Sequence, residues 1–376
     1  HLHHAGAEHT AVGNAVRGAD GIAPLVELLR AGGGSEAAAN AAGALCSLAA
    51  NNPTNQDAIR EAGGIAPLVE LLRAGGGSEA AAKAAGALWI LAVNNQTNQD
   101  AIREAGGIAP LVELLRAGGG SEAAAKAAGA LMNLAERNPT NQDAIREAGG
   151  IAPLIELLRA GGGSEAAAKA AGALMNLADR NQTNMDAIRE AGGITPLVEL
   201  LRAGGGSEAA ATAAEALWNL ASDNQTNQDA IREVGGIVLL VELLRAGGAS
   251  MAAALAAGAL WDLAFSNPTN KDAIREAGGI TPLVELLRAG GGSFAAANAA
   301  EVLHNLAYDN PAVAAAVLAA VAADGAPSLE PFSRLLTDLQ RCAERLLVSA
   351  EAGDDAGKLS SAIEQAAAVK VGAATL

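Results

Sequence analysis

Apolar and polar positions recur along this chain with a constant step of 43 residues. The clearest repeated segment is Leu-Val/Ile-Glu-Leu-Leu-Arg-Ala-Gly, which begins at Leu25, Leu68, Leu111, Leu154, Leu197, Leu240 and Leu283. A gapless repeat of this length is typical of a solenoid, because each unit leaves an apolar face that only the next unit covers. The sequence therefore predicts one elongated domain rather than several globular ones.

Residues 96–138 show the helices expected in one unit. The first helix is expected to begin at Thr97, whose hydroxyl is followed three residues later by a carboxylate, the spacing of a capping box. It ends at the glycine pair 106–107, which can adopt the left-handed backbone of a helix stop. A second helix has Pro110 in its first turn and ends at the glycine run 118–120.

Ser121 is expected to cap a third, longer helix that runs to about Arg137. Helical spacing places its apolar residues on one inner face: Ala127, Ala128, Leu131, Leu134 and Ala135. The period-two alternation of a half-buried strand does not occur in the unit. The prediction is therefore an all-α chain with three helices per unit.

The repeated Ile-Ala-Pro-Leu-Val-Glu-Leu-Leu, followed by Ala-Leu-x-Asn-Leu-Ala, resembles the armadillo repeat of importin-α and β-catenin. The resemblance covers about residues 10 to 310 in seven copies. It implies a right-handed α-solenoid, or superhelix, whose third helices line a concave groove that binds extended peptides. We expect residues 1–325 to form this solenoid with a degenerate N-terminal start, and residues 326–376 to form degenerate capping helices. The alternative is that this last segment folds back over the groove.

The resemblance implies a column of asparagines in the groove, where each carboxamide holds the backbone of a bound peptide. In this chain the ladder column reads Ser47, Ile90, Asn133, Asn176, Asn219, Asp262 and Asn305. Importin-like members carry Trp four residues before that Asn, where this chain has Gly43, Gly86, Gly129, Gly172, Glu215, Gly258 and Glu301. Binding of nuclear localisation signals is therefore not expected.

The residues just before the ladder column form a pre-ladder column: Cys46, Trp89, Met132, Met175, Trp218, Trp261 and His304. Their varied sizes fit the edge of a groove, and core packing is an equally open interpretation. Further along, apolar residues replace the charged positions of earlier repeats: Met251, Leu255, Phe265, Phe294 and Tyr308. An exposed apolar patch usually marks an interface, so these residues, with Asp262 and Glu301, predict a partner segment with hydrophobic anchors and a basic residue.

Composition narrows the class of partner and the class of protein. The formal net charge of −16 and the pI near 4.7 would repel nucleic acid. No apolar run is long enough for membrane insertion, and Cys46 and Cys342 form no metal-binding or paired framework, which fits a reducing compartment such as the cytoplasm or nucleus. The glycine runs lack the Gly-Lys-Ser/Thr of a phosphate loop, and His304 stands alone as a candidate base. We expect no catalytic residue, no metal, no cofactor and no enzyme activity.

Three functions remain open from the sequence. The leading one is an interaction scaffold or adaptor that binds an extended or disordered partner segment. The others are a nuclear transport adaptor of the importin-α type, and a structural array in a cytoskeletal or axonemal assembly that uses the convex face. Repeats this alike arise from recent duplication or from design, and both origins stay open.

Overall fold

The computed structural model describes residues 2–307, except 33–34, 76–77, 118, 205–206, 249 and 290–292. Every regular element in this part of the chain is an α-helix, and 21 helices follow one another as seven triplets, here called repeats one to seven. The all-α prediction is confirmed. Tyr308 and the predicted capping helices in 326–376 lie outside the described residues.

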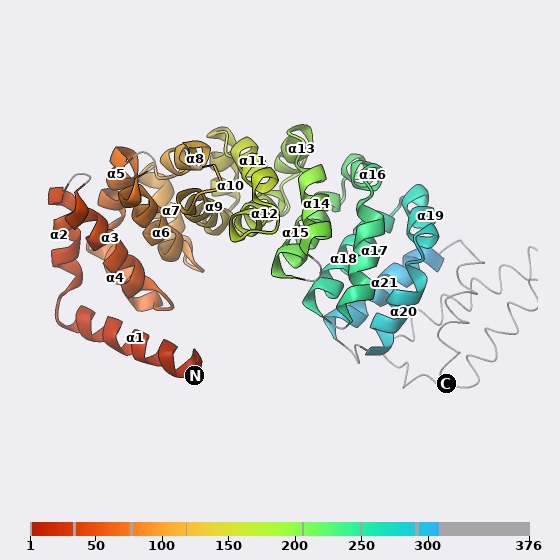
Figure 1. Ribbon diagram of the computed structural model, residues 1–376, viewed down its shortest axis with the longest axis horizontal. Helices are drawn as coiled ribbons and strands as arrows, with labels where there is room; N and C mark the ends of the chain where they lie inside the picture. Colours follow the sequence, from red (N-terminus) through yellow and green to blue (C-terminus); the bar gives the residue numbers. More distant parts are fainter. Residues whose placement is uncertain are drawn as a thin grey trace, which may run out of the picture. The chain divides into compact units, whose positions relative to one another are not determined.

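The helices keep the same order in every repeat (Figure 1). The first helices are α1 (Leu2–Gly18), α4 (Pro53–Glu61), α7 (Gln96–Glu104), α10 (Pro139–Glu147), α13 (Gln182–Glu190), α16 (Gln225–Glu233) and α19 (Pro268–Glu276). The second helices are α2 (Ile22–Gly32), α5 (Ile65–Gly75), α8 (Ile108–Ala117), α11 (Ile151–Gly161), α14 (Ile194–Gly204), α17 (Gly236–Gly247) and α20 (Ile280–Ala289). The third helices are α3 (Glu36–Ala49), α6 (Glu79–Ala92), α9 (Glu122–Ala135), α12 (Glu165–Ala178), α15 (Glu208–Ala221), α18 (Met251–Ala264) and α21 (Phe294–Ala307).

The chain divides into two compact units, His1–Leu200 and Leu201–Leu376, and the division falls inside α14. In the first unit the third helices α3, α6, α9 and α12 pack against one another in sequence. In the second unit α15, α18 and α21 do the same. Each unit therefore has a layer of third helices, against which the second helices pack.

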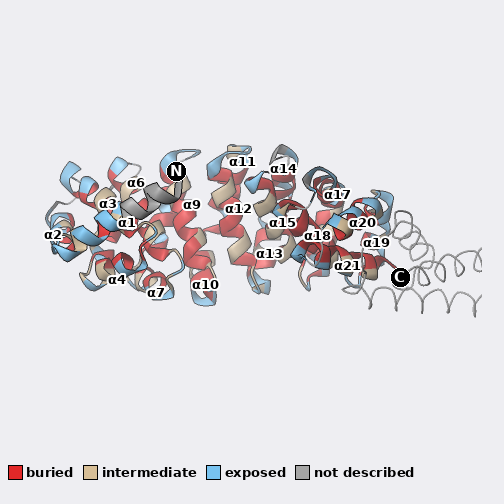
Figure 2. Cartoon of the chain, turned by 90° about the horizontal axis from the view of Figure 1, so that it is seen from below, coloured by how far each residue is buried: buried red, intermediate tan, exposed pale blue. Residues whose placement is uncertain are grey.

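Small side chains allow the third helices to pack closely. In α9 the inner face predicted from helical spacing is buried, and Leu131 and Leu134 are fully buried. Figure 2 shows buried positions running along the third helices. Burying a leucine side chain contributes about 1.5–3 kcal/mol, so the repetition of this face supplies the core of each unit.

The caps explain where the helices begin and end. Ser121 has an extended backbone and its hydroxyl accepts a hydrogen bond from the N–H of Ala124 at 3.3 Å, as predicted. The third helix ends at Ala135, two residues before the predicted end, and Arg137 takes a positive φ of 50°. The expected cap at Thr97 is wrong, because the side chain of Asn95 accepts from the N–H of Asn98 at 3.0 Å and starts the helix at the next residue.

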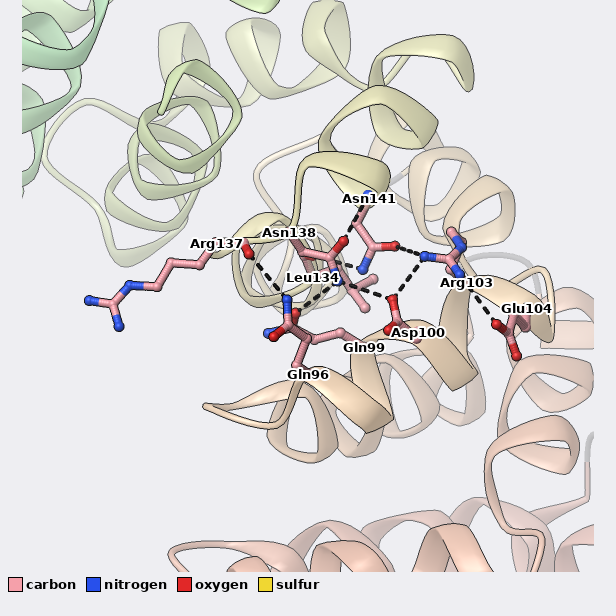
Figure 3. A network of polar contacts seen from close by, with 9 residues as sticks. All are labelled: Gln96, Gln99, Asp100, Arg103, Glu104, Leu134, Arg137, Asn138 and Asn141. Atoms are coloured by element: carbon pink, nitrogen blue, oxygen red, sulfur yellow. Dashed lines mark hydrogen bonds and ion pairs between the residues drawn. The ribbon is translucent and has the colours of Figure 1, made fainter. Parts of the chain in front are cut away.

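The first helices are joined from one repeat to the next by buried amides (Figure 3). Asn138 donates to Gln99 Oε1 and to Asp100 Oδ1, both at 3.2 Å. Asn141 is fully buried; its Nδ2 donates to the carbonyl of Leu134 at 2.9 Å and its Oδ1 accepts from Arg103 Nη1 at 3.1 Å. These bonds satisfy buried polar groups while they join repeats three and four.

The last-turn arginine of a second helix makes another contact between repeats. Arg116 Nη2 donates to the carbonyls of Ala148 and Gly149, at 3.4 and 3.1 Å, beyond the end of α10. Arg30, Arg73 and Arg245 donate in the same way to the two residues that follow the first helix of the next repeat. A cation at a helix C-terminus interacts favourably with the helix dipole, so the contact stabilises the junction between repeats.

Candidate partner-binding face

The side chains of the third helices that are not packed between helices form what we call the third-helix face. In α9 these are Glu122, which is exposed, and Ala125, Lys126 and Met132, which are half-buried. Within each unit, corresponding positions of the other third helices lie in columns, because the repeats share one register. This face contains the ladder and pre-ladder columns predicted from the sequence.

The ladder asparagines of the first unit bond to the chain itself. Asn133 is only 6% exposed, and its Nδ2 donates to the carbonyl of Trp89 at 3.1 Å. Asn176 is half-buried and donates in the same way to the carbonyl of Met132 at 2.9 Å. A carboxamide has two N–H donors and an acceptor oxygen, so one donor in each case joins neighbouring repeats. Their predicted role in holding a peptide stays a prediction.

Three ladder positions lie in the second unit: Asn219, Asp262 and Asn305, all of them half-buried. The Nδ2 atom of Asn305 is buried and has no hydrogen-bond partner among the described residues. Asp262 cannot make the bond that Asn133 makes when it is ionised, because a carboxylate has no N–H. The ladder therefore differs chemically between the two units.

All seven residues of the pre-ladder column are half-buried. This placement favours a surface column over core packing. The Trp89 ring lies against Gly129 of the next third helix, where a Cβ atom would come within 2.9 Å of two ring atoms. Trp218 lies against Gly258 in the same way, at 2.6 Å. Gly129 and Gly258, at positions where importin-like members carry Trp, thus leave room for the Trp of the preceding repeat. The sequence contains a signal for this packing, because each of these glycines follows its Trp by 40 residues. Our predictions from the sequence did not include it.

We expect Gly129→Ala to displace the Trp89 ring, because the added methyl group would overlap it. Gly86→Ala is the matched control: the nearest atom to its added Cβ would be Lys126 Cδ at 3.4 Å, an ordinary contact. Alanine is favoured over glycine inside a helix by about 1 kcal/mol, so Gly86→Ala should raise the free energy of unfolding. Near-ultraviolet circular dichroism and urea unfolding measure both effects, and an unchanged tryptophan spectrum in Gly129→Ala would contradict this packing.

Lysines of the chain cover the face of the first unit. Lys83 pairs with Glu79 at 2.9 Å and Lys126 with Glu122 at 2.7 Å. Both pairs have the i,i+4 spacing of neighbours on one helix face, and such exposed pairs contribute only a few tenths of a kcal/mol. The Nζ of Lys169 lies 4.8 Å from the centre of the Trp89 ring, a cation–π contact from two repeats away.

The face of the second unit is apolar where the first unit has lysines. Exposed large side chains are Met251, Phe265 and Phe294, at 66%, 49% and 53% exposure. The rings of Phe294 and Trp218 stack with their centres 6.1 Å apart. The expectation of an exposed Leu255 is wrong: at 7% exposure it belongs to the core. Leucine has no charged end that must reach water, so it is buried at the position where the lysines of repeats two to four are half-buried.

Among the described residues of this face, Asp262 has the pKa that departs furthest from its ordinary value. Burial raises its pKa to about 6, and the nearby Asp223 carboxylate acts in the same direction. The polar side chains of Ser222 and Trp218 act in the opposite direction and lower its pKa, but by less than burial raises it. Glu301 is exposed and Trp261 is half-buried on the same face. The second unit thus combines aromatic rings with a carboxyl group whose pKa is raised to about 6.

Other classes of site find no support among the described residues. No group of three or more His, Cys, Asp or Glu side chains in residues 2–307 is placed to hold a metal ion. No helix in the part of the chain that the structure describes is long and apolar enough to cross a membrane. Burial raises the pKa of the Cys46 thiol, which keeps it protonated and weakly nucleophilic.

Comparisons with known proteins match both the repeat and the arrangement of repeats. The family described as Armadillo/beta-catenin-like repeat matches residues 181–222. An engineered protein solved by crystallography is 30% identical with a TM-score of 0.74, over 96% of this chain and 91% of that one. A designed armadillo repeat protein in complex with the peptide (KR)4 is 28% identical with a TM-score of 0.58, over 64% of this chain and 99% of its own.

A further structure with a TM-score of 0.58 belongs to computationally designed armadillo repeat proteins for modular peptide recognition. It is 27% identical, over 64% of this chain and 99% of that chain. A search of curated protein sequences found no match. The solved structures similar to this chain therefore include proteins made to bind peptides.

Proposed function

Because this chain belongs to the armadillo-repeat family, we propose that it is a protein-binding scaffold that holds an extended partner segment on the third-helix face of its second unit. The designed relatives bind or were made to recognise peptides, which supports a protein-binding role. A solenoid of this type offers a repeated surface and no catalytic constellation, so we propose no enzyme activity. We place the protein in the cytoplasm or nucleus, where Cys46 would stay reduced.

One observation carries the proposal: three large apolar side chains are exposed on this face of the second unit. Phe294 also stacks on Trp218, so its position is defined before a partner arrives. Rigid aromatic anchors lose little conformational entropy on binding and dominate interface energies. Met251 and Phe265 lie at opposite ends of α18, a helix of 14 residues, or about 21 Å at 1.5 Å per residue. An extended partner segment of about six or seven residues would reach both side chains.

The acidic residues of this face indicate which charge the partner segment carries. Asp262 and Glu301 are the acidic groups next to the aromatic rings, and the lysines of the first unit have no counterpart here: Thr212, Leu255 and Asn298 take their places. An acidic site of this kind favours a lysine or arginine on the partner. The ladder residue Asn219 would hold the partner backbone through its carboxamide, and Asn305 would accept from it through its Oδ1, since its Nδ2 is buried.

The test is a selection of displayed random peptides on the immobilised protein, followed by affinity measurement of a selected peptide on variants. We expect Phe294→Ala to weaken binding about 30-fold, since truncation of an aromatic anchor costs about 2 kcal/mol. Val238→Ala is the matched control, because Val238 is 48% exposed but lies on the second helix α17. Equal affinity of Phe294→Ala and wild type would overturn the proposal.

A further inference from the structure

We propose that the first unit carries a separate site for a basic side chain of a partner, formed by the Trp89 ring and covered in the free protein by the chain's own Lys169. The site lies on the third-helix face of the first unit, so the inference goes beyond the function proposed for the second unit. Gly86 holds the position at which importin-like members carry Trp, so the resemblance does not predict this site. A partner opens it by displacing one lysine.

Three third helices of the first unit form the site. Trp89 in α6 is half-buried, and its ring lies against Gly129 of α9. The main-chain carbonyl of Trp89 accepts a hydrogen bond from Asn133, also in α9, at 3.1 Å. Lys169 of α12 places its Nζ over the ring, 4.8 Å from the ring centre. The ring is thus held in place by the next repeat, and its cation comes from the repeat after that.

An internal comparison shows what draws Lys169 to the ring. The helices α9 and α12 have the same sequence from their first residue to their last. Lys126 in α9 pairs with the glutamate four residues before it, at 2.7 Å, whereas Lys169 makes no such pair with Glu165 in the described part of the chain. The residue 80 positions before each lysine is Cys46 in the first case and Trp89 in the second. The difference therefore comes from outside the helix, and the ring is the group that Lys169 contacts.

The lysine indicates which chemistry the ring accepts from a partner. The face of an indole attracts ammonium and guanidinium groups through its quadrupole, and more strongly than the other aromatic side chains do. A guanidinium group is also planar and stacks on such a ring, so the site fits either arginine or lysine. Once displaced, Lys169 has Glu165 one helical turn away, the pairing that Lys83 and Lys126 already make in their own helices. The exchange therefore costs the chain little.

The cover lowers the affinity of the site by a predictable factor. A partly exposed cation–π contact favours the covered ring about fivefold, which leaves the ring free in about one molecule in six. The apparent affinity for a partner cation is reduced by that fraction. Removal of the lysine side chain should therefore raise the affinity about sixfold.

Two alanine variants of the full chain test the cover without a partner. Lys169→Ala uncovers the ring, and Lys126→Ala is the matched control, because it removes the same charge from the same helix sequence while its ammonium group pairs with Glu122. The 3 tryptophans give three indole signals in a nitrogen–proton NMR spectrum, which Trp→Phe variants assign. We expect the Trp89 signal to move further in Lys169→Ala than in Lys126→Ala. An equal or smaller movement in Lys169→Ala would overturn the inference.

A titration with the peptide (KR)4, which a designed armadillo repeat protein binds, tests the site itself. Its binding is followed through the Trp89 signal, while the signals of Trp218 and Trp261 report separately on the second unit. At the Trp89 signal we expect Lys169→Ala to bind the peptide about sixfold more tightly than Lys126→Ala does. A peptide that moves only the Trp218 and Trp261 signals overturns this inference and leaves the proposed function in place. One that moves only the Trp89 signal supports the inference and contradicts the site proposed on the second unit.

Discussion

Replacing Asn141 with leucine is expected to lower the free energy of unfolding by about 2–4 kcal/mol. The amide of Asn141 is fully buried, and its removal takes away the hydrogen bond to the Leu134 carbonyl. The Arg103 guanidinium loses one partner and keeps its bonds to Asp100 and Glu104. A buried polar group left unsatisfied costs about 1–3 kcal/mol, and more when a charged group is involved. Urea unfolding measures the total loss.

Asn98→Leu is the matched control, because Asn98 occupies the same position one repeat earlier. Its Nδ2 also donates to a carbonyl, that of Leu91 at 2.9 Å, but its buried Oδ1 has no hydrogen-bond partner. Leucine there removes this bond, a longer one to the carbonyl of Gln56 at 3.4 Å, and the unsatisfied acceptor. No charged group loses a partner, so we expect a cost about 1 kcal/mol smaller than at Asn141. Equal losses for the two variants would show that the Arg103 bond contributes nothing.

The effect of Asn141→Leu should also be local. Each repeat of a solenoid contacts only its neighbours, so stability is close to a sum of repeat and junction contributions. Hydrogen exchange should therefore accelerate in α7 to α10 while the helices of the second unit keep their protection. Uniform acceleration along the whole chain would contradict this description.

Asp262→Asn is expected to raise the free energy of unfolding at pH 7 by about 1–2 kcal/mol. Folding raises the pKa of Asp262 from 3.8 to about 6, which would correspond to about 3 kcal/mol for a fully buried group; the half-buried position and solvent screening reduce this value. The unfolded chain loses the proton at lower pH than the folded chain, so wild-type stability falls as the pH rises from about 4 to about 6. The asparagine variant does not titrate and keeps its stability through this window.

Unfolding of both proteins at pH 4, 5, 6 and 7 measures the difference. We expect the two stabilities to diverge between pH 4 and 6 and to stay apart above that. Asp223→Asn is the control for removing one negative charge, since Asp223 is exposed, and its effect should be well below 1 kcal/mol. A variant less stable than wild type at pH 7 would mean that the ionised carboxylate stabilises the fold.

The stability cost at Asp262 has a bearing on function. At the ladder positions of the first unit, Asn133 and Asn176 each donate a hydrogen bond that joins two neighbouring repeats. A residue that is expected to lower the stability of its fold, at a position where another residue type would fit better, is a candidate for a functional role. Asp262 lies on the third-helix face of the second unit, as do the exposed rings of Phe265 and Phe294, where we propose that a partner uses its charge.

The helices and their caps could be predicted because the signals that set them are local. Ser121 and the glycine at 106, with a φ of +72°, act within a few residues of their own positions. The first helix start was misplaced because Asn95 and Thr97 are both capping residues two positions apart. The amide of Asn95 also bonds to Asp57 at 3.1 Å in the preceding repeat, a contact that favours it and that no local pattern contains.

The candidate site was predicted less completely, because helical spacing gives the face of a residue but not its partner. It placed the ladder on one face, yet gave no sign that the Asn133 amide bonds to the Trp89 carbonyl. The sequence also predicted an exposed Leu255, because lysine occupies the equivalent position in repeats two to four. Burial there depends on the side chains of neighbouring helices, which vary from repeat to repeat.

The arginine contact beyond each second helix has a consequence for chain length. Its donor and acceptors are always 32 and 33 residues apart, as for Arg73 with Ala105 and Gly106. Four triplets carry this donor for the following copy, with both bonds made: those of Arg30, Arg73, Arg116 and Arg245. Arg159 makes only the bond to Gly192, and no described side chain lies against Gly235, the equivalent glycine after α16. The four complete junctions have interchangeable ends, so these are the places where we expect a triplet to be inserted or removed with its contacts intact.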